Sequence, residues 1–121
     1  MGSKLSIKAQ LQVGVLEEAK RKADRIHALI EQMIGARVGQ EGLLQPIGRA
    51  AVDLQRLLMN NGLGVMADAS NQIAMLAKRG GSIQTKTRSF RELVNSIKSA
   101  IDTRTKVVIA EDKREDGGGD E

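Results

Sequence analysis

Residues 82–102, SIQTKTRSFRELVNSIKSAID, carry the most regular pattern in the chain. Side chains suited to a helix seam recur there at steps of four, three, four, three and four residues, at Ile83, Thr87, Phe90, Val94, Ile97 and Ile101. This spacing is typical of a helix packed nearly antiparallel against a neighbouring helix. Ser82 follows two glycines and is a candidate N-cap. We therefore predict a helix from Ile83 to at least Thr103, with Phe90, the only aromatic residue, in the core.

Three further helices are predicted on the N-terminal side of this segment. The first covers residues 16–37, where Arg37 lies in the last turn and Gly39 is a stop signal. The second has Pro46 in its first turn and is ended by residues 60–64, and the third covers about 65–79. The side chains expected to point inward are Leu16, Ala19, Ala23, Ile26, Ile30 and Met33, then Ile47, Ala51, Leu54 and Leu58, and then Met66, Ile73, Leu76 and Ala77.

Residues 4–15 fit two kinds of structure. Apolar and polar side chains alternate strictly from Leu5 to Val15, which is a strand pattern. The same stretch also supports a helical stripe that runs in phase into the helix at 16–37, and its Lys, Gln, Ala and Leu content favours a helix. A strand would need a partner, and 105–109 is the only other β-rich run. We favour the helix and keep a short N-terminal strand as the alternative.

The pattern as a whole predicts an all-α fold, a small antiparallel bundle of about four helices. The two middle helices together match one long helix, so three rods with a broken middle rod are also possible. Residues 1–113 are assigned to the bundle domain. Residues 114–121 combine acidic side chains with three consecutive glycines, and we predict that they form a disordered tail.

Composition limits the classes of function. The 121 residues include no Cys, Trp or Tyr, which excludes disulfides, thiol catalysis and Cys-ligated zinc. The longest apolar run, at residues 73–77, has five residues, far short of a membrane span of roughly 20. No secretory leader is evident, and we expect a cytoplasmic protein. The net charge of +4 is uneven: residues 111–121 hold two basic and six acidic side chains, against 17 and nine in residues 1–110.

His27 is the only histidine, and Asp24 precedes it by one helical turn. Carboxylate-bridged di-iron bundles need such a pair on each of two helices, so one chain cannot build that metal site. The surroundings of His27 are faintly similar to a histidine-phosphotransfer pattern, but Ile30 replaces the expected Lys and Glu31 and Gln32 replace small residues. No nucleophile or acid–base pair stands at motif spacing either. We therefore predict no enzyme activity, no cofactor and no metal.

A basic stretch, 78–106, supports an alternative function. It contains eight basic residues against Glu92 and Asp102 only. Aromatic stacking platforms are missing, so any nucleic-acid binding would rest on phosphate charge. The residues predicted to bind an anion or nucleic acid under this alternative are Lys78, Arg79, Lys86, Arg88, Arg91 and Lys98.

The first residues, MGSKLS, fit the loose N-myristoylation pattern with Gly2 and Ser6, although Met-Gly-Ser is also a common expression scar. We expect contact with a membrane only if Gly2 is acylated.

The leading hypothesis rests on residues 4–15, which carry more apolar side chains than one helix–helix contact can cover. On a helix, Ile7, Leu11 and Val15 lie away from the Leu5, Ala9 and Val13 face, and a monomer readily covers only one of those faces. We therefore predict a non-enzymatic interaction protein that associates through this second face with copies of itself, as a dimer or larger assembly, or with another helical protein.

Overall fold

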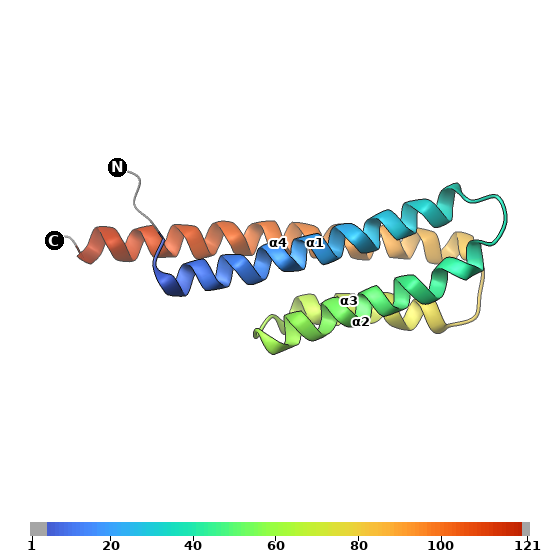
Figure 1. Cartoon of the computed structure of the whole chain (residues 1–121), viewed down its shortest axis with the longest axis horizontal. Coiled ribbons are helices and arrows are strands. Elements are labelled where there is room, and N and C mark those ends of the chain that lie inside the picture. Colours follow the sequence, from blue (N-terminus) through green and yellow to red (C-terminus); the bar gives the residue numbers. More distant parts are fainter. Residues whose placement is uncertain (1–4, 120–121) are drawn as a thin grey trace.

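Four α-helices, each antiparallel to the next, make up most of the part of the chain that the structure describes (Figure 1). This computed structural model describes residues 5–119, with side chains over 5–114. The elements in chain order are α1 (Ile7–Gly35), a 3₁₀ turn η1 (Gln40–Leu43), α2 (Leu44–Asn60), α3 (Gly64–Lys78) and α4 (Ile83–Gly119). The all-α bundle predicted from the sequence is confirmed. Within residues 5–119 no helix is both long and apolar enough to cross a membrane.

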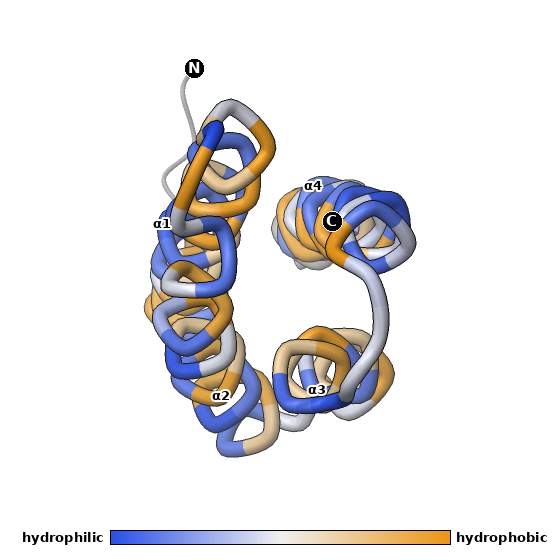
Figure 2. Tube along the Cα trace, turned by 90° about the vertical axis from the view of Figure 1, so that its right-hand side faces the viewer, coloured by the Kyte–Doolittle hydropathy of each residue, from blue (hydrophilic) through white to orange (hydrophobic). Residues whose placement is uncertain are grey.

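The four helices follow one another around a shared core. Each packs against its neighbours in the order α1, α2, α3, α4 and back to α1. Seen end-on in Figure 2, they surround the centre, where apolar positions gather. The alternative of three rods is wrong, because α2 and α3 form a hairpin of two antiparallel helices in intimate contact. The hairpin is short and covers only part of the α1–α4 pair, as Figure 1 shows.

α1 settles the ambiguity over residues 4–15 for the residues described. Ser6 is the N-cap, and its Oγ accepts a hydrogen bond of 3.1 Å from the Ala9 N–H. A helix runs from Ile7 without a break, so the alternative of an N-terminal strand is wrong. The inward residues predicted between Leu16 and Met33 are all buried. The helix ends at Gly35, so Arg37 lies beyond it rather than in its last turn.

The inner face of α3 differs from the one predicted. Ile73 is buried as expected, but Met66, Leu76 and Ala77 are only half-buried. Their places in the core are taken by smaller residues, Ala67, Ser70 and Ala74. Ser70 tolerates full burial because its hydroxyl donates a 2.7 Å hydrogen bond to the Ala51 carbonyl on α2.

Small residues also let α2 and α3 approach closely. Gly48 is buried in α2, and a Cβ atom placed on it would lie 3.3 Å from the Cβ of Ala77 on α3. The α2 residues predicted to point inward, Ile47, Ala51, Leu54 and Leu58, are all fully buried.

α4 confirms the pattern that best predicts the fold. Ser82 caps it, with its Oγ 3.2 Å from the Thr85 N–H, and Phe90 is fully buried. The buried seam then continues past the predicted minimum to Val108. α4 extends to Gly119, whereas the sequence predicts a disordered tail from residue 114; the side chains from 115 onward and all of 120–121 lie outside the described residues, so the tail stays a prediction there.

Candidate interaction surface

The apolar line predicted on α1 lies on an exposed part of that helix. Ile7 is 78% exposed and Leu11 is 68% exposed, while Val15 is half-buried. The difference follows from the length of the α2–α3 hairpin. Its tip, at Asn61 and Leu63, lines the same small pocket as Val15. The hairpin stops there, and the first turns of α1 extend beyond it (Figure 1).

The hairpin tip adds apolar side chains to this region. Met59, in the last turn of α2, is 57% exposed, and Val65, in the first turn of α3, is 87% exposed. We call the first turns of α1 and this tip the N-terminal step; its apolar side chains are Ile7, Leu11, Val15, Met59, Leu63 and Val65. Four of the six large hydrophobic residues that are exposed in the described part of the chain belong to it. Sequence analysis missed Met59 and Val65 because nothing local indicates where a hairpin ends against its neighbours.

A polar contact holds the step in place. The Ser6 hydroxyl donates a 2.6 Å hydrogen bond to the Asp112 carboxylate on α4, and the Ser6 backbone N–H donates another of 2.9 Å. These two bonds, the hydroxyl's first, lower the pKa of Asp112 from its ordinary value. The first turn of α1 is therefore tied to α4, so Ile7 and Leu11 are presented on an ordered helix.

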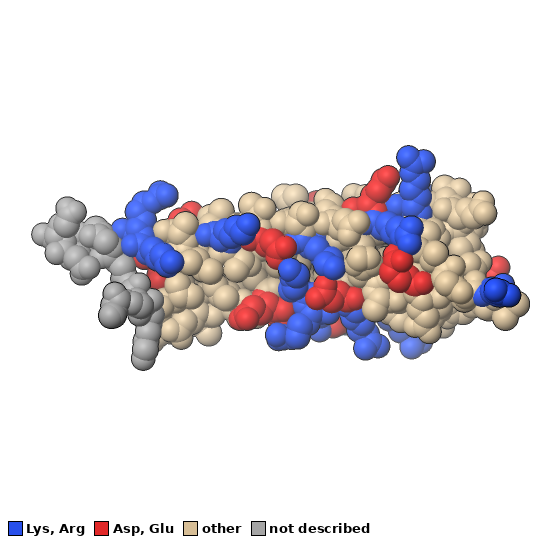
Figure 3. Space-filling model, turned by 90° about the horizontal axis from the view of Figure 1, so that it is seen from above, with Lys and Arg blue, Asp and Glu red and all other residues tan. Residues whose placement is uncertain are grey.

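Ion pairs join α1 and α4 in one constant register. Lys20 contacts Asp102 at 2.7 Å, and Asp24 contacts Lys98 at 3.0 Å. Glu31 then accepts two hydrogen bonds, of 2.7 and 2.9 Å, from the guanidinium of Arg91. Each step forward along α1 is matched by an equal step back along α4. Figure 3, which looks onto this side of the molecule, shows acidic and basic side chains interleaved along it.

These ion pairs shift the pKa values of their members. Hydrogen bonding from Arg91 lowers the pKa of Glu31, and hydrogen bonding from Lys20 lowers the pKa of Asp102. The pKa values of Lys20 and Arg91 are raised by the same bonds. Because all of these side chains are substantially exposed, each pair contributes modestly, and we expect their main role to be in setting the register.

Acid should destabilise the bundle through these carboxyl groups. Glu31, Asp102 and Asp112 have lower pKa values folded than unfolded, so their contribution is present at neutral pH and is lost as the pH falls through their folded-state values. Urea unfolding should therefore show decreasing stability below about pH 4, near the ordinary carboxyl range. Asp112→Asn should flatten this acid dependence. Asp68→Asn is the matched control, because Asp68 is exposed and forms no ion pair with the side chains that the structure describes. An equal change in both variants would contradict the assignment.

His27 is engaged between α1 and α4. Its Nδ1 lies 3.1 Å from the Lys98 Nζ, so the ring accepts a hydrogen bond there from the ammonium group. Its Nε2 lies 3.6 Å from a Glu31 carboxylate oxygen, which would repel an incoming phosphoryl group. This environment gives no support to phosphotransfer, and we interpret His27 as part of the α1–α4 contact.

The six cations of the alternative hypothesis do not form one surface. Lys86 is buried, at 6% exposure, and its Nζ donates to the Arg79 carbonyl at the end of α3. Arg91 and Lys98 are held by carboxylates of α1, and Arg88 lies 3.5 Å from Glu92 on its own helix. Lys78 and Arg79 are exposed at the end of α3. The partners of Arg91 and Lys98 are far away in sequence, which is why the basic stretch looked uncompensated. Nucleic-acid binding through these residues stays a prediction.

Three arginines that form no ion pair within the described structure lie elsewhere. A groove of about 620 Å³ runs between the outer sides of α1 and α2, and its lining includes Arg21, Arg25 and Arg49. Asp53 also lines this groove, but it contacts the Lys22 ammonium at 2.5 Å. Sequence analysis did not single out these arginines. Their spacing of four residues on α1 is the signal that could have found part of the cluster.

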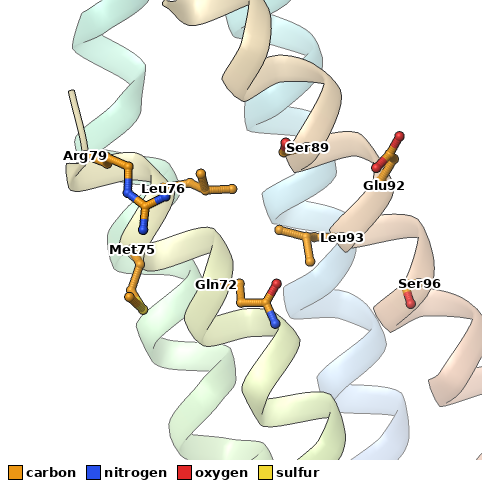
Figure 4. Close-up of a pocket in the computed structure, with 8 residues that line it drawn as sticks. All are labelled: Gln72, Met75, Leu76, Arg79, Ser89, Glu92, Leu93 and Ser96. Atoms are coloured by element: carbon orange, nitrogen blue, oxygen red, sulfur yellow. The ribbon is translucent and has the colours of Figure 1, made fainter. Parts of the chain in front are cut away.

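A second groove, of about 540 Å³, separates α3 from α4 (Figure 4). Leu76 and Leu93 extend into it from the two helices, with Arg79 and Glu92 at its edges. Among the side chains described, no group of three or more His, Asp or Glu residues could hold a metal ion. Gly2, the candidate acylation site, lies outside the described residues.

A scan against protein-family models found no match to this chain, and searches of curated proteins and of solved structures found none either.

Proposed function

We propose that this chain is a non-enzymatic interaction protein that associates through the N-terminal step with copies of itself or with helices of another protein. The observation that carries the proposal is the exposure of Ile7 and Leu11, 78% and 68%, on a helix that is anchored by Ser6 and Asp112. A mobile segment could expose apolar side chains at little cost, but a capped helix holds them in water permanently. Contiguous apolar surface of this kind marks interaction sites in soluble proteins.

The form of the step supports a helix as the partner. Beyond the hairpin tip, α1 and α4 continue as a pair of helices, whereas at the other end four helices share the core. A helix laid along the first turns of α1 would cover side chains that α2 would cover if it were longer. Recognition of a helix by an apolar groove or face is a common mode of association.

Leu11→Lys should abolish the association without unfolding the bundle. Leu11 is exposed, so the lysine adds no buried charge to the monomer, whereas in an apolar interface it would be desolvated and unpaired. Sedimentation equilibrium should show the wild-type mass rising above 13.1 kDa with concentration, and the variant remaining at 13.1 kDa. Val38→Lys, a matched change at an 87% exposed site far from the step, should behave as the wild type. Equal masses for wild type and Leu11→Lys at every concentration would contradict self-association through the step.

A further inference from the structure

We infer that the partner at the N-terminal step is a second copy of this chain, whose α1 lies antiparallel to the first with Leu11 of each copy against Gly14 of the other. This inference rests on the proposed function and specifies the occupant and its register. It starts from a line of four exposed residues on α1, Ile7, Leu11, Gly14 and Glu18. Their steps of four, three and four residues are those of a seam between two nearly antiparallel helices.

Gly14 is the first argument. It lies in the interior of α1, where glycine is among the poorest helix-forming residues. Its φ is not positive, and a Cβ atom at this position would meet nothing within 4 Å. Neither the backbone conformation nor packing within the monomer therefore requires glycine here. A missing side chain beside the exposed Leu11 would let a second helix approach closely, and the Leu11 side chain of that helix would fill the space.

Charge complementarity is the second argument. In an antiparallel pair, a step forward on one helix is a step back on the other, so placing Leu11 opposite Gly14 fixes every other pair. Ile7 of each copy is then level with Glu18 of the other, and Lys8 is the next residue along the helix. The long Lys8 side chain can therefore reach the Glu18 carboxylate of the other copy. The two-fold axis repeats the contact, so the dimer contains two such ion pairs, each between the lysine of one copy and the carboxylate of the other.

The groups needed for this contact are accessible in the monomer. Lys8 is exposed and forms no ion pair with the described side chains. Glu18 is also exposed, and its contact with Lys22 on the same helix is long, at 4.0 Å. A second copy thus offers its Leu11 side chain to fill the space beside Gly14, and its Glu18 carboxylate to pair with Lys8. Both copies use the same surface, as a symmetric dimer requires.

Charge reversal tests the register. Lys8→Glu places acids opposite acids in the dimer, and Glu18→Lys places lysines opposite lysines. Each variant alone should raise the dimer dissociation constant about tenfold, because two attractive contacts become repulsive. The double variant Lys8→Glu/Glu18→Lys should recover dimerisation, and so should an equimolar mixture of the two single variants. Glu41→Lys, a charge reversal at an exposed residue of η1 at the opposite end of the molecule, should leave the constant unchanged.

Gly14→Ala gives an independent readout. Alanine fits the monomer and favours the helix, so the melting temperature of the dilute monomer should rise. The added methyl group should at the same time weaken the dimer. A purely structural role for Gly14 would not move these two quantities in opposite directions.

The possible results distinguish an error in the register of the dimer from an error in the proposed function. A dimer that depends on Leu11, but whose charge reversals are not rescued by the double variant or by mixing, overturns this register and leaves the proposed function standing. A monomer at all concentrations overturns both the second copy and self-association, and leaves a helix of another protein as the occupant. Recovery in the double variant and in the mixture supports the antiparallel dimer, because parallel helices would bring Lys8 level with Lys8.

Discussion

Phe90→Ala is expected to lower the free energy of unfolding by about 3–5 kcal/mol, the usual cost of deleting a buried phenyl ring and leaving a cavity. Phe90 is fully buried in the middle of α4, and it has the largest of the fully buried side chains. A domain of this size has roughly 5–15 kcal/mol in total, so the variant should melt roughly 10–20 °C lower or fail to fold. Thermal unfolding followed by circular dichroism measures the effect.

Met75→Ala is the matched control for this experiment. Met75 is also a large apolar residue of the bundle, but its side chain is 50% exposed, so its truncation leaves no enclosed cavity. It should cost no more than about 1 kcal/mol. A Phe90→Ala protein that keeps its melting temperature would contradict the core position of Phe90, and the register of α4 along with it.

Gly48→Leu is expected to separate α2 from α3 and to cost about 1–3 kcal/mol, the range typical of overpacking in a close-packed core. Even a Cβ atom at this position would lie 3.3 Å from the Cβ of Ala77, which is tighter than an ordinary contact. A leucine side chain must displace α3 or adopt a strained rotamer. Urea unfolding of the variant and of the wild type gives the difference.

Gly35→Leu provides the comparison for Gly48→Leu. Gly35 is helical too, but a Cβ atom there would meet nothing within 4 Å, so the same substitution should change stability little. If Gly48→Leu were as stable as Gly35→Leu, the close approach of α2 and α3 at Gly48 could not be correct.

Sequence periodicity predicts the parts of the fold that depend on one helix alone. The inner face of α1 from Leu16 to Met33 and the α4 seam from Phe90 to Ile101 were predicted correctly, because apolar side chains at steps of three and four leave one choice of face. At the start of α4, Ile83 and Thr87 are only half-buried. The inner face of α3 was predicted less well. Met66 and Leu76 are more apolar than Ser70, but three of the four buried residues of α3 are small, and the hydrogen bond to Ala51 makes the serine suitable for burial.

The candidate site divides in the same way. Ile7 and Leu11 were predicted because the local sequence places apolar residues on a second face of the helix, in addition to the face that packs in the bundle. The pairing of Arg91 with Glu31, and of Lys98 with Asp24, depends on the register between two helices separated by the whole α2–α3 hairpin. The local sequence does not indicate such contacts. The net charge counted over one segment is therefore larger than the charge that remains unpaired when the segment packs against the rest of the protein.

The contact between Ser6 and Asp112 has a practical consequence for anyone handling this protein. It brings the beginning of α1 and the last part of α4 to the same end of the rod, beside Ile7 and Leu11 (Figure 1). An affinity tag or a fluorescent fusion joined to either end of the chain is therefore delivered to the surface that we propose for association. Solid-phase attachment through the loop between α1 and α2, at the opposite end, would leave that surface free.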